Sequence, residues 1–343
     1  MADRYSEDEL IAKLFKPVAG ATGVFLDDDA AFLPPSQQRR YVVTTDALVA
    51  GVHFFADDPP GLIAKKALRV NLSDLAAKGA QPCAFLLTLC LPPDWTNDWL
   101  AAFAKGLHED VDQFRCRLIG GDTTATPGPL TVSITAFGAT GDDDIYIARK
   151  GAQPGDAIYV SGPIGDAALG LALRRDPTLA EGVSAEARDY LLDRYLRPNP
   201  RLDLLSTLRA HATAAMDISD GLAGDLVKLC RASGVSAVIN LPLVPLSKAA
   251  REVATRVPAL FETAITGGDD YEILFTANLS ATSTRLGARI DGDVGVMVSA
   301  GAGLSLPRGV VRIGNIVAGN EPPVFLDSDG KTRNFKKMSF QHF

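Results

Sequence analysis

Several residue types that often carry chemistry are scarce in this chain of 343 residues. It has only four cysteines, Cys83, Cys90, Cys116 and Cys230, and only four histidines. No two cysteines form a CxxC pair, and no histidine cluster accompanies them. This pattern argues against a zinc site and a disulfide framework, and it favours buried free thiols in a reducing compartment.

An excess of positive charge and a long apolar run are also absent. Lys and Arg number 34 against 41 Asp and Glu, a net charge of −7, which argues against binding to duplex DNA or an anionic membrane. The apolar segment 84–91 is too short to span a bilayer, and the charged start, 1–8, lacks the apolar core of a signal peptide. We therefore expect a soluble, cytoplasmic protein with neither nucleic acid nor membrane as partner.

The composition is that of a globular protein, with 47% apolar and 22% charged residues. At roughly 150 residues a domain, the length suggests two domains. Turn-rich segments, 141–144 and 151–155, flank a short predicted strand, and the boundary is placed there. We expect an N-terminal domain, 1–145, and a C-terminal domain, 146–343.

Helical and strand patterns alternate in both halves without regular βαβ order, which favours two α/β or α+β domains. A capping box begins a first helix at Ser6, and the continuous apolar segment 84–91 is typical of a central strand. The other predicted helices are 62–77, 95–114, 165–173 and 220–232, and the other predicted strands are 41–45, 117–119, 130–137, 157–161, 237–240 and 272–276.

The distinctive feature of the sequence is a series of aspartates among small residues, each expected in a polar turn at a strand end or helix start. They are Asp27 to Asp29, Asp46, Asp74, Asp122, Asp217 with Asp220, and Asp269 with Asp270. Taken singly, most are better explained as helix caps or solvated turns. Taken together, carboxylates and hydroxyls without histidine or thiol partners favour Mg²⁺ bound with substrate phosphates.

Other nucleotide motifs have less support. Gly330-Lys331-Thr332 ends like a Walker A loop, but Phe325 stands where its first glycine is required. The turn 162–165 could face a phosphate, although a strand-to-helix turn without ligand is the favoured interpretation. His108 is expected on a solvated helix face, and no protein-kinase or zincin pattern is present.

Six motifs occur in an order that resembles the thiamine-monophosphate kinase family: TTDALVAGVHF, NLSDLAAKGA, GGDTT, RPNPR, DISDGL and GGDDYE. The resemblance runs from about Asp28 to the last aromatic segment. It implies a fold similar to aminoimidazole ribonucleotide synthetase. In that fold the sheet of an N-terminal α/β domain helps to form a homodimer sheet or barrel, and a C-terminal α/β sandwich domain completes the active site. The implied reaction is ATP plus thiamine monophosphate giving ADP plus thiamine diphosphate.

The resemblance also assigns roles to residues of this chain. It implies that several Mg²⁺ ions are held by Asp29, Thr44, Thr45, Asp46, Asp74, Asp122, Asp217 and Asp220. Of these, Asp46, Asp74, Asp122 and Asp220 would serve catalysis most directly. It implies ATP contacts from Gly121, Asp122, Arg149 and Ser219, and substrate contacts from His53, Asp269 and Phe340.

Three positions depart from the family pattern. Asp27 replaces a usual glycine, Asp269 stands where many members have glutamate, and Phe340 stands where Tyr or Trp is common. These changes affect substrate contacts more than metal ligands. A cyclo-ligase of the same superfamily and a non-catalytic nucleotide-binding dimer remain the alternative functions.

Overall fold

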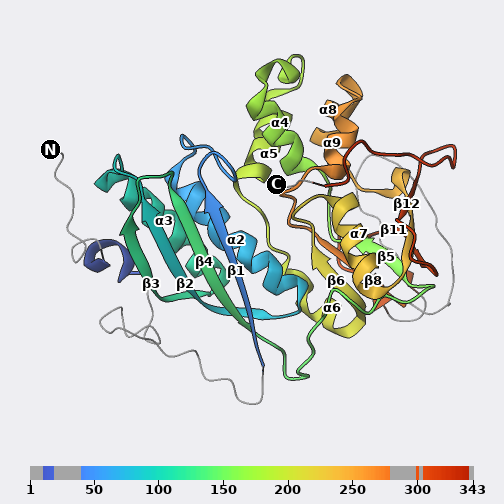
Figure 1. Cartoon of the computed structure of the whole chain (residues 1–343), viewed down its shortest axis with the longest axis horizontal. Coiled ribbons are helices and arrows are strands. Elements are labelled where there is room, and N and C mark those ends of the chain that lie inside the picture. Colours follow the sequence, from blue (N-terminus) through green and yellow to red (C-terminus); the bar gives the residue numbers. More distant parts are fainter. Residues whose placement is uncertain (1–10, 19–39, 279–298, 301–303, 340–343) are drawn as a thin grey trace. The chain divides into compact units, whose positions relative to one another are not determined.

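The computed structural model describes residues 11–18, 40–278, 299–300 and 304–339 (Figure 1). The chain forms two compact units. The first unit comprises residues 1–76 and 80–145, and the second comprises residues 77–79 and 146–343. The chain passes from one unit to the other at 145–146, in the turn-rich region. Each unit is described by itself below.

The first unit is a four-stranded mixed sheet with two long helices, both on one face in Figure 1. Its strands are β1 (Tyr41–Val49), β2 (Gln81–Leu91), β3 (Arg117–Ala125) and β4 (Thr131–Ala139), in the order β1-β4-β2-β3. Its helices are α2 (Pro60–Ala77) and α3 (Asn97–Phe114), preceded by a short helical turn, η1 (Ile11–Phe15). Strand β4 is antiparallel to both β1 and β2, whereas β2 and β3 are parallel.

Side-chain periodicity explains how this layer forms. Strand β4 alternates buried and half-buried residues along its length, because one face packs under the helices. Strand β2 lies between β4 and β3, which confirms the central position predicted for 84–91. Helices α2 and α3 approach closely where Gly106 meets Gly61. A Cβ on Gly106 would lie 2.2 Å from the Gly61 carbonyl oxygen, so only glycine fits there.

Three of the predicted acidic turns are wrong. Asp46 lies within β1, Asp74 within the last turns of α2, and Asp122 within β3. The glycine before Asp122 has a packing role, since a Cβ on Gly121 would lie 1.8 Å from the Leu87 carbonyl oxygen. The small residues of GGDTT are typical of a turn, but here Gly121 allows two backbones to approach inside a sheet.

The second unit is built on a six-stranded sheet in the order β12-β7-β11-β5-β8-β6. These strands are β5 (Ala157–Val160), β6 (Ala212–Asp217), β7 (Ser236–Asn240), β8 (Ile273–Ala277), β11 (Val311–Val317) and β12 (Val324–Leu326). A separate pair is formed by β9 (Ser299–Ala300) and β10 (Leu304–Ser305). The α-helices are α4 (Asp166–Arg175), α5 (Ala185–Leu196), α6 (Leu205–His211), α7 (Leu222–Ser233), α8 (Lys248–Arg256) and α9 (Leu260–Thr266). Short 3-10 turns are η3 (Pro177–Ala180), η4 (Leu202–Leu204) and η5 (Leu241–Leu243).

The described residues of this second unit include two apolar cores. One lies between the sheet and α7, with Met216, Leu226 and Phe325 among its buried residues. The other lies among α4, α5, α8 and α9, around Leu169 and Leu191. The loops that connect the sheet to the four-helix group therefore have packed elements on both sides.

Some local expectations differ from the structure. The described part of the first predicted helix is η1, while Ser6 lies outside the described residues. Residues 145–150 form no strand. Cys116 and Cys230 are buried, but Cys83 and Cys90 are only half-buried, and all four are free. Among the described residues, no helix has the length and hydropathy needed to cross a membrane.

Candidate active site

Two predicted carboxylates of the first unit face each other between β1 and α2. Thr44 and Asp46 lie on the same face of β1, because side chains alternate along a strand. The Thr44 hydroxyl donates a hydrogen bond of 2.6 Å to Asp74 Oδ2. Burial, and then repulsion from Asp74, raises the pKa of Asp46 to about 6. We call Asp46 and Asp74 the acidic pair.

No cationic side chain of the described chain forms an ion pair with the acidic pair. Among the described residues, the Thr44 hydroxyl donates a hydrogen bond to Asp74, and no positive charge offsets the repulsion between the two carboxylates. Two hard oxygen ligands beside a hydroxyl suit Mg²⁺, which commonly takes one or two carboxylates and completes its shell with water and phosphate. The donor set thus fits the metal that the sequence predicts.

Not all predicted ligands of this unit converge on the acidic pair. The Thr45 side chain points to the opposite face of β1, where its hydroxyl contacts the Ile134 carbonyl at 3.2 Å and the Thr135 hydroxyl at 3.0 Å. Asp122 is exposed on β3, at the other edge of the sheet. Three inter-strand spacings of about 4.8 Å separate β1 from β3, or about 14 Å.

His53 follows β1 in a short turn, half-buried. Its Nδ1 accepts a hydrogen bond of 3.0 Å from the Val49 backbone N–H. Its carbonyl oxygen accepts another of 3.0 Å from Lys66 Nζ. Because Nδ1 is an acceptor, a neutral imidazole carries its proton on Nε2. The His53 ring is therefore held in one orientation, and its hydrogen-bond donor is Nε2–H.

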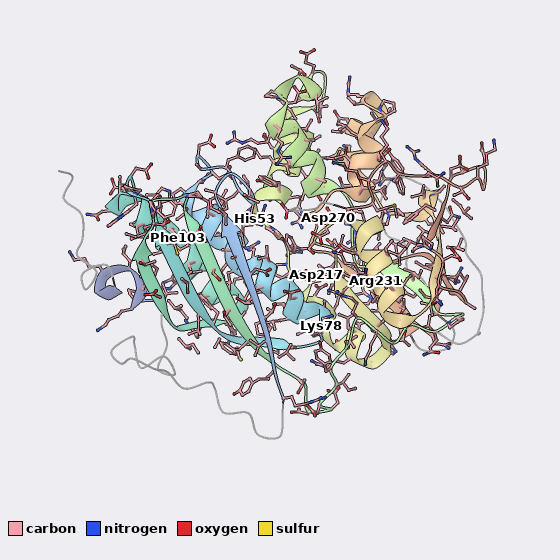
Figure 2. The ribbon with its side chains drawn as sticks, in the orientation of Figure 1. His53, Lys78, Phe103, Asp217, Arg231 and Asp270 are labelled. Atoms are coloured by element: carbon pink, nitrogen blue, oxygen red, sulfur yellow. The ribbon has the colours of Figure 1, made fainter. Side chains whose placement is uncertain are left out.

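In the second unit, the DISDG motif forms the end of β6 and the loop before α7. Asp217 closes β6 and is buried, with an exposed fraction of 7% (Figure 2). Asp220 is half-buried and its carboxylate is paired with Lys228. Lys228 also donates to Asp225 Oδ1 at 2.7 Å, and Asp225 Oδ2 accepts from the Asp220 backbone N–H at 2.9 Å. The loop is thus fixed to the first turns of α7.

The GGDDYE motif forms the loop before β8. Asp269 N–H donates to the Ser219 carbonyl at 2.9 Å, and Tyr271 N–H donates to the Ile218 carbonyl at 2.8 Å. The loop therefore runs beside the DISDG loop. This backbone hydrogen bond brings Asp269 and Ser219, two predicted site residues, next to each other.

Three other predicted site residues have no described contact with the acidic pair or with the DISDG and GGDDYE loops. Arg149 is exposed in the segment after the unit boundary. Asp29 and Phe340 lie outside the described residues. Within the described ranges, no three His, Cys, Asp or Glu side chains gather closely enough to hold a metal ion on their own.

Sequence reasoning missed Lys228 and Asp225. A helix starting near Asp220 brings residues three and four apart onto one face, so Asp225 and Lys228 at i,i+3 were visible as a pair. The sequence predicts only that Glu272, buried in the structure, begins a strand, and it assigns no role to Arg201 in RPNPR. Their pairing joins positions 71 residues apart, which no local pattern reveals.

The chain matches two family models of the AIR synthase related proteins. The N-terminal domain model covers residues 27–140, and the C-terminal domain model covers residues 153–293. A thiamine-monophosphate kinase of Caulobacter vibrioides is 42% identical over 275 residues, which are 78% of this chain and 76% of that protein.

The chain belongs to the thiamine-monophosphate kinase family. The crystal structure of a thiamine-monophosphate kinase from Stenotrophomonas maltophilia K279a matches with a TM-score of 0.72 at 38% identity, covering 90% of this chain and 91% of that one. The structure of AaThiL complexed with AMPPCP and TMP matches with a TM-score of 0.72 at 28% identity, covering 98% and 97%. The predicted family and the two-domain AIR synthase-like fold are confirmed.

Proposed function

We propose that this protein transfers the γ-phosphoryl group of ATP to thiamine monophosphate, giving ADP and thiamine diphosphate. The observation that carries the proposal is the family membership, at up to 42% identity over most of both chains. It is supported by the full-length match to a family structure that contains AMPPCP, an ATP analogue, together with TMP.

The transfer is proposed to be direct, without a phosphoenzyme. An oxygen of the acceptor phosphate attacks the γ-phosphorus, the bond to the β,γ-bridging oxygen breaks, and ADP leaves with that electron pair. Such a transfer depends on in-line positioning and on neutralisation of phosphate charge more than on covalent help from the protein. A phosphate oxygen is already anionic, so no strong general base is required.

Mg²⁺ is proposed as the cation of the reaction, with several ions held by residues of both units. Asp46, Asp74 and Thr44 would hold one in the first unit, where two carboxylates lack a cationic partner among the described residues. The remaining proposed ligands are Asp29, Asp122, Asp217 and Asp220, and Thr45 is left out because its side chain lies on the opposite face of β1. When bound, Mg²⁺ neutralises phosphate charge and orients the oxygens of the transferred group.

Substrate recognition is proposed to come from His53, Asp269 and Phe340. His53 Nε2–H suits an acceptor phosphate oxygen, because Nδ1 is fixed as an acceptor. A carboxylate and an aromatic ring suit the cationic thiamine ring system. Gly121, Asp122, Arg149 and Ser219 are proposed to contact ATP.

We further propose that the protein works as a homodimer in the cytoplasm, and that both domains, 1–145 and 146–343, contribute to the active site. Light scattering on the purified chain tests the dimer. A monomer with full activity would contradict it.

The proposed function is tested by incubating purified protein with ATP, Mg²⁺ and thiamine monophosphate, and separating the products by chromatography. Thiamine diphosphate should form, and free thiamine should give none. EDTA should abolish the product, and added Mg²⁺ should restore it. Failure to form thiamine diphosphate while ATP still binds would favour the cyclo-ligase or nucleotide-sensing alternatives.

A further inference from the structure

The RPNPR segment has no role in the proposed function, although it is one of the six motifs. It follows α5 and leads into η4. Its two arginines differ sharply in environment. Arg197 pairs with Asp193 on the surface, both side chains about 41% exposed, whereas the Arg201 side chain is only 10% exposed.

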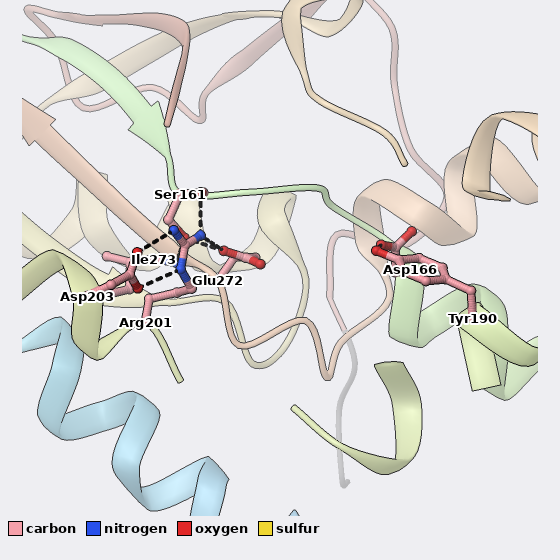
Figure 3. A network of polar contacts seen from close by, with 7 residues as sticks. All are labelled: Ser161, Asp166, Tyr190, Arg201, Asp203, Glu272 and Ile273. Carbon is pink, nitrogen blue, oxygen red and sulfur yellow. Dashed lines mark hydrogen bonds and ion pairs between the residues drawn. The ribbon is translucent and has the colours of Figure 1, made fainter. Parts of the chain in front are cut away.

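Arg201 joins three segments of the second unit (Figure 3). Its Nε and Nη2 each contact the Asp203 carboxylate at 3.0 Å, and Nη1 contacts Glu272 Oε2 at 2.7 Å. Nη1 also donates to the Ser161 carbonyl oxygen. Burial alone would lower the pKa of Arg201, but the carboxylates of Asp203 and Glu272 outweigh it and raise that pKa.

Glu272 is the residue through which this network reaches the GGDDYE loop. Its side chain is buried and accepts from the Ser161 hydroxyl as well as from Arg201. The same hydroxyl accepts a hydrogen bond of 2.7 Å from the Ile273 backbone N–H. The Glu272 carbonyl oxygen accepts from the Ile218 N–H at 2.8 Å. Both ends of the residue are therefore tied down, at the point where the loop becomes β8.

Two residues of this loop have a backbone conformation that residues other than glycine rarely adopt. Asp269 has φ of 72° and Tyr271 has φ of 51°. Neither is glycine, so both conformations are disfavoured and persist only where neighbouring contacts fix them. Strain of this kind indicates that contacts with neighbouring residues hold the loop in this conformation.

A second anchor acts from the middle of the loop. Asp270 is buried, and its Oδ2 accepts a hydrogen bond of 2.8 Å from the Gly165 N–H, just before α4. Asp166 at the start of α4 accepts in turn from the Tyr190 hydroxyl at 2.9 Å and the Ser247 hydroxyl at 2.5 Å. Asp270 is therefore bonded to the start of α4, which is itself held by the hydrogen bonds of Asp166.

We propose that Arg201, acting through Glu272, is a positioning residue that holds the 267–272 loop in its strained shape and so presents Asp269 to the thiamine part of the substrate. The role rests on the proposed function. In this role Arg201 does not itself contact the substrate. It sets the direction of a carboxylate that does.

The energetics favour positioning over general stability. A buried ion pair gains little net stability, since desolvation offsets the attraction, and apolar residues of similar volume often serve as well. The Arg fork, however, binds two carboxylates and a carbonyl in fixed directions, which lysine cannot reproduce. Such a group is suited to fixing a loop.

The test compares three variants with the wild type: Arg201→Lys, the double variant Arg201→Met with Glu272→Leu, and the surface control Arg197→Lys. Steady-state kinetics give KM for thiamine monophosphate, KM for ATP and kcat. Thermal melting reports folding, and hydrogen exchange by mass spectrometry reports the 267–272 backbone. The double variant removes both charges, so it avoids leaving one buried and unpaired.

We expect KM for thiamine monophosphate to rise about tenfold or more in both Arg201 variants, a loss of about 1.4 kcal/mol, with KM for ATP changed much less. Exchange in 267–272 should increase in the same variants, and Arg197→Lys should match the wild type. A folded Arg201 variant with unchanged KM and unchanged exchange would overturn the proposal. So would an equal rise in both KM values, because that indicates a general loss of structure.

The two proposals fail in different ways. If the wild type forms no thiamine diphosphate, the proposed function fails, and exchange in 267–272 still decides whether Arg201 holds the loop. If the double variant does not fold, Arg201→Lys decides, since it keeps the positive charge.

Discussion

The two units treat closely spaced carboxylates in opposite ways. In the first unit, Asp46 and Asp74 repel each other, and the Thr44 hydroxyl donates a hydrogen bond to Asp74. In the second, Lys228 forms an ion pair with each of Asp220 and Asp225. Burial raises the pKa of Asp46 to about 6 and also raises that of Asp225, so both groups are costly to ionise. The difference teaches that a buried carboxylate can be given a lysine partner by its own helix, as in the second unit, or can lack a cationic partner among the described residues, as in the first.

The largest expected effect comes from the uncompensated pair. Asp74→Asn should reduce kcat for thiamine diphosphate formation about 1,000-fold, about 4 kcal/mol in activation free energy, because it removes a proposed metal ligand. The assay is product chromatography at saturating substrates. Asp112→Asn, exposed on α3 in the same unit, is the control. Full activity of the Asp74 variant would show that the acidic pair is not a metal site.

Removing Lys228, which pairs with Asp220 and Asp225, should lower the stability of the fold. Lys228→Met leaves the buried Asp225 without its cation and should lower the free energy of unfolding by about 2–3 kcal/mol. Urea unfolding measures this loss, with the exposed Lys105→Met as control. Adding Asp225→Asn to Lys228→Met should recover part of the loss. No recovery would mean that Lys228 stabilises the loop by packing and not by charge.

A smaller effect should come from the hydroxyl beside the acidic pair. Thr44→Val removes the hydrogen bond to Asp74 and should lower kcat/KM by about tenfold, about 1.4 kcal/mol, as for a hydrogen bond to a charged group. Thr45→Val should cost less, since that side chain contacts β4 on the opposite face. Equal losses in the two variants would contradict the assignment of faces.

The smallest effect concerns Asp166, a buried carboxylate that accepts hydrogen bonds from the hydroxyls of Ser247 and Tyr190. Burial raises the pKa of Asp166 above 3.8, although Ser247 and Tyr190 oppose the shift. The folded state then binds more protons than the unfolded state, so stability decreases as pH rises above about 4. Asp166→Asn keeps an acceptor oxygen and removes this dependence.

Thermal melting of the wild type and Asp166→Asn at pH 4 and pH 7 checks the sign. The melting temperature of Asp166→Asn minus that of the wild type should be higher at pH 7 than at pH 4. If that difference is instead higher at pH 4, the Asp166 pKa lies below its ordinary value and the predicted direction is wrong.

Much of the fold was predictable because it follows from local periodicity. The helices at 62–77 and 95–114 and the strand at 84–91 appear within a few residues of their predicted bounds. The acidic motifs were harder. GGDTT reads as a turn by composition, but Gly121 is required by the approach of Leu87 in the neighbouring strand. Local sequence cannot distinguish a glycine that bends the chain from one that makes room for another strand.

The sequence by itself determined the family, the order of the motifs and the choice of hard oxygen ligands, because these depend on residue identity and spacing. Only the tertiary structure decided how the residues are grouped. It placed Asp46 near Asp74, which accepts a hydrogen bond from Thr44, set Asp122 at the far edge of the same sheet, and gave Asp220 a lysine partner. It also brought Arg201 to Glu272, 71 positions away. The physical reason is that charge pairing and close packing depend on distance in space, which strand order and loop shape decide.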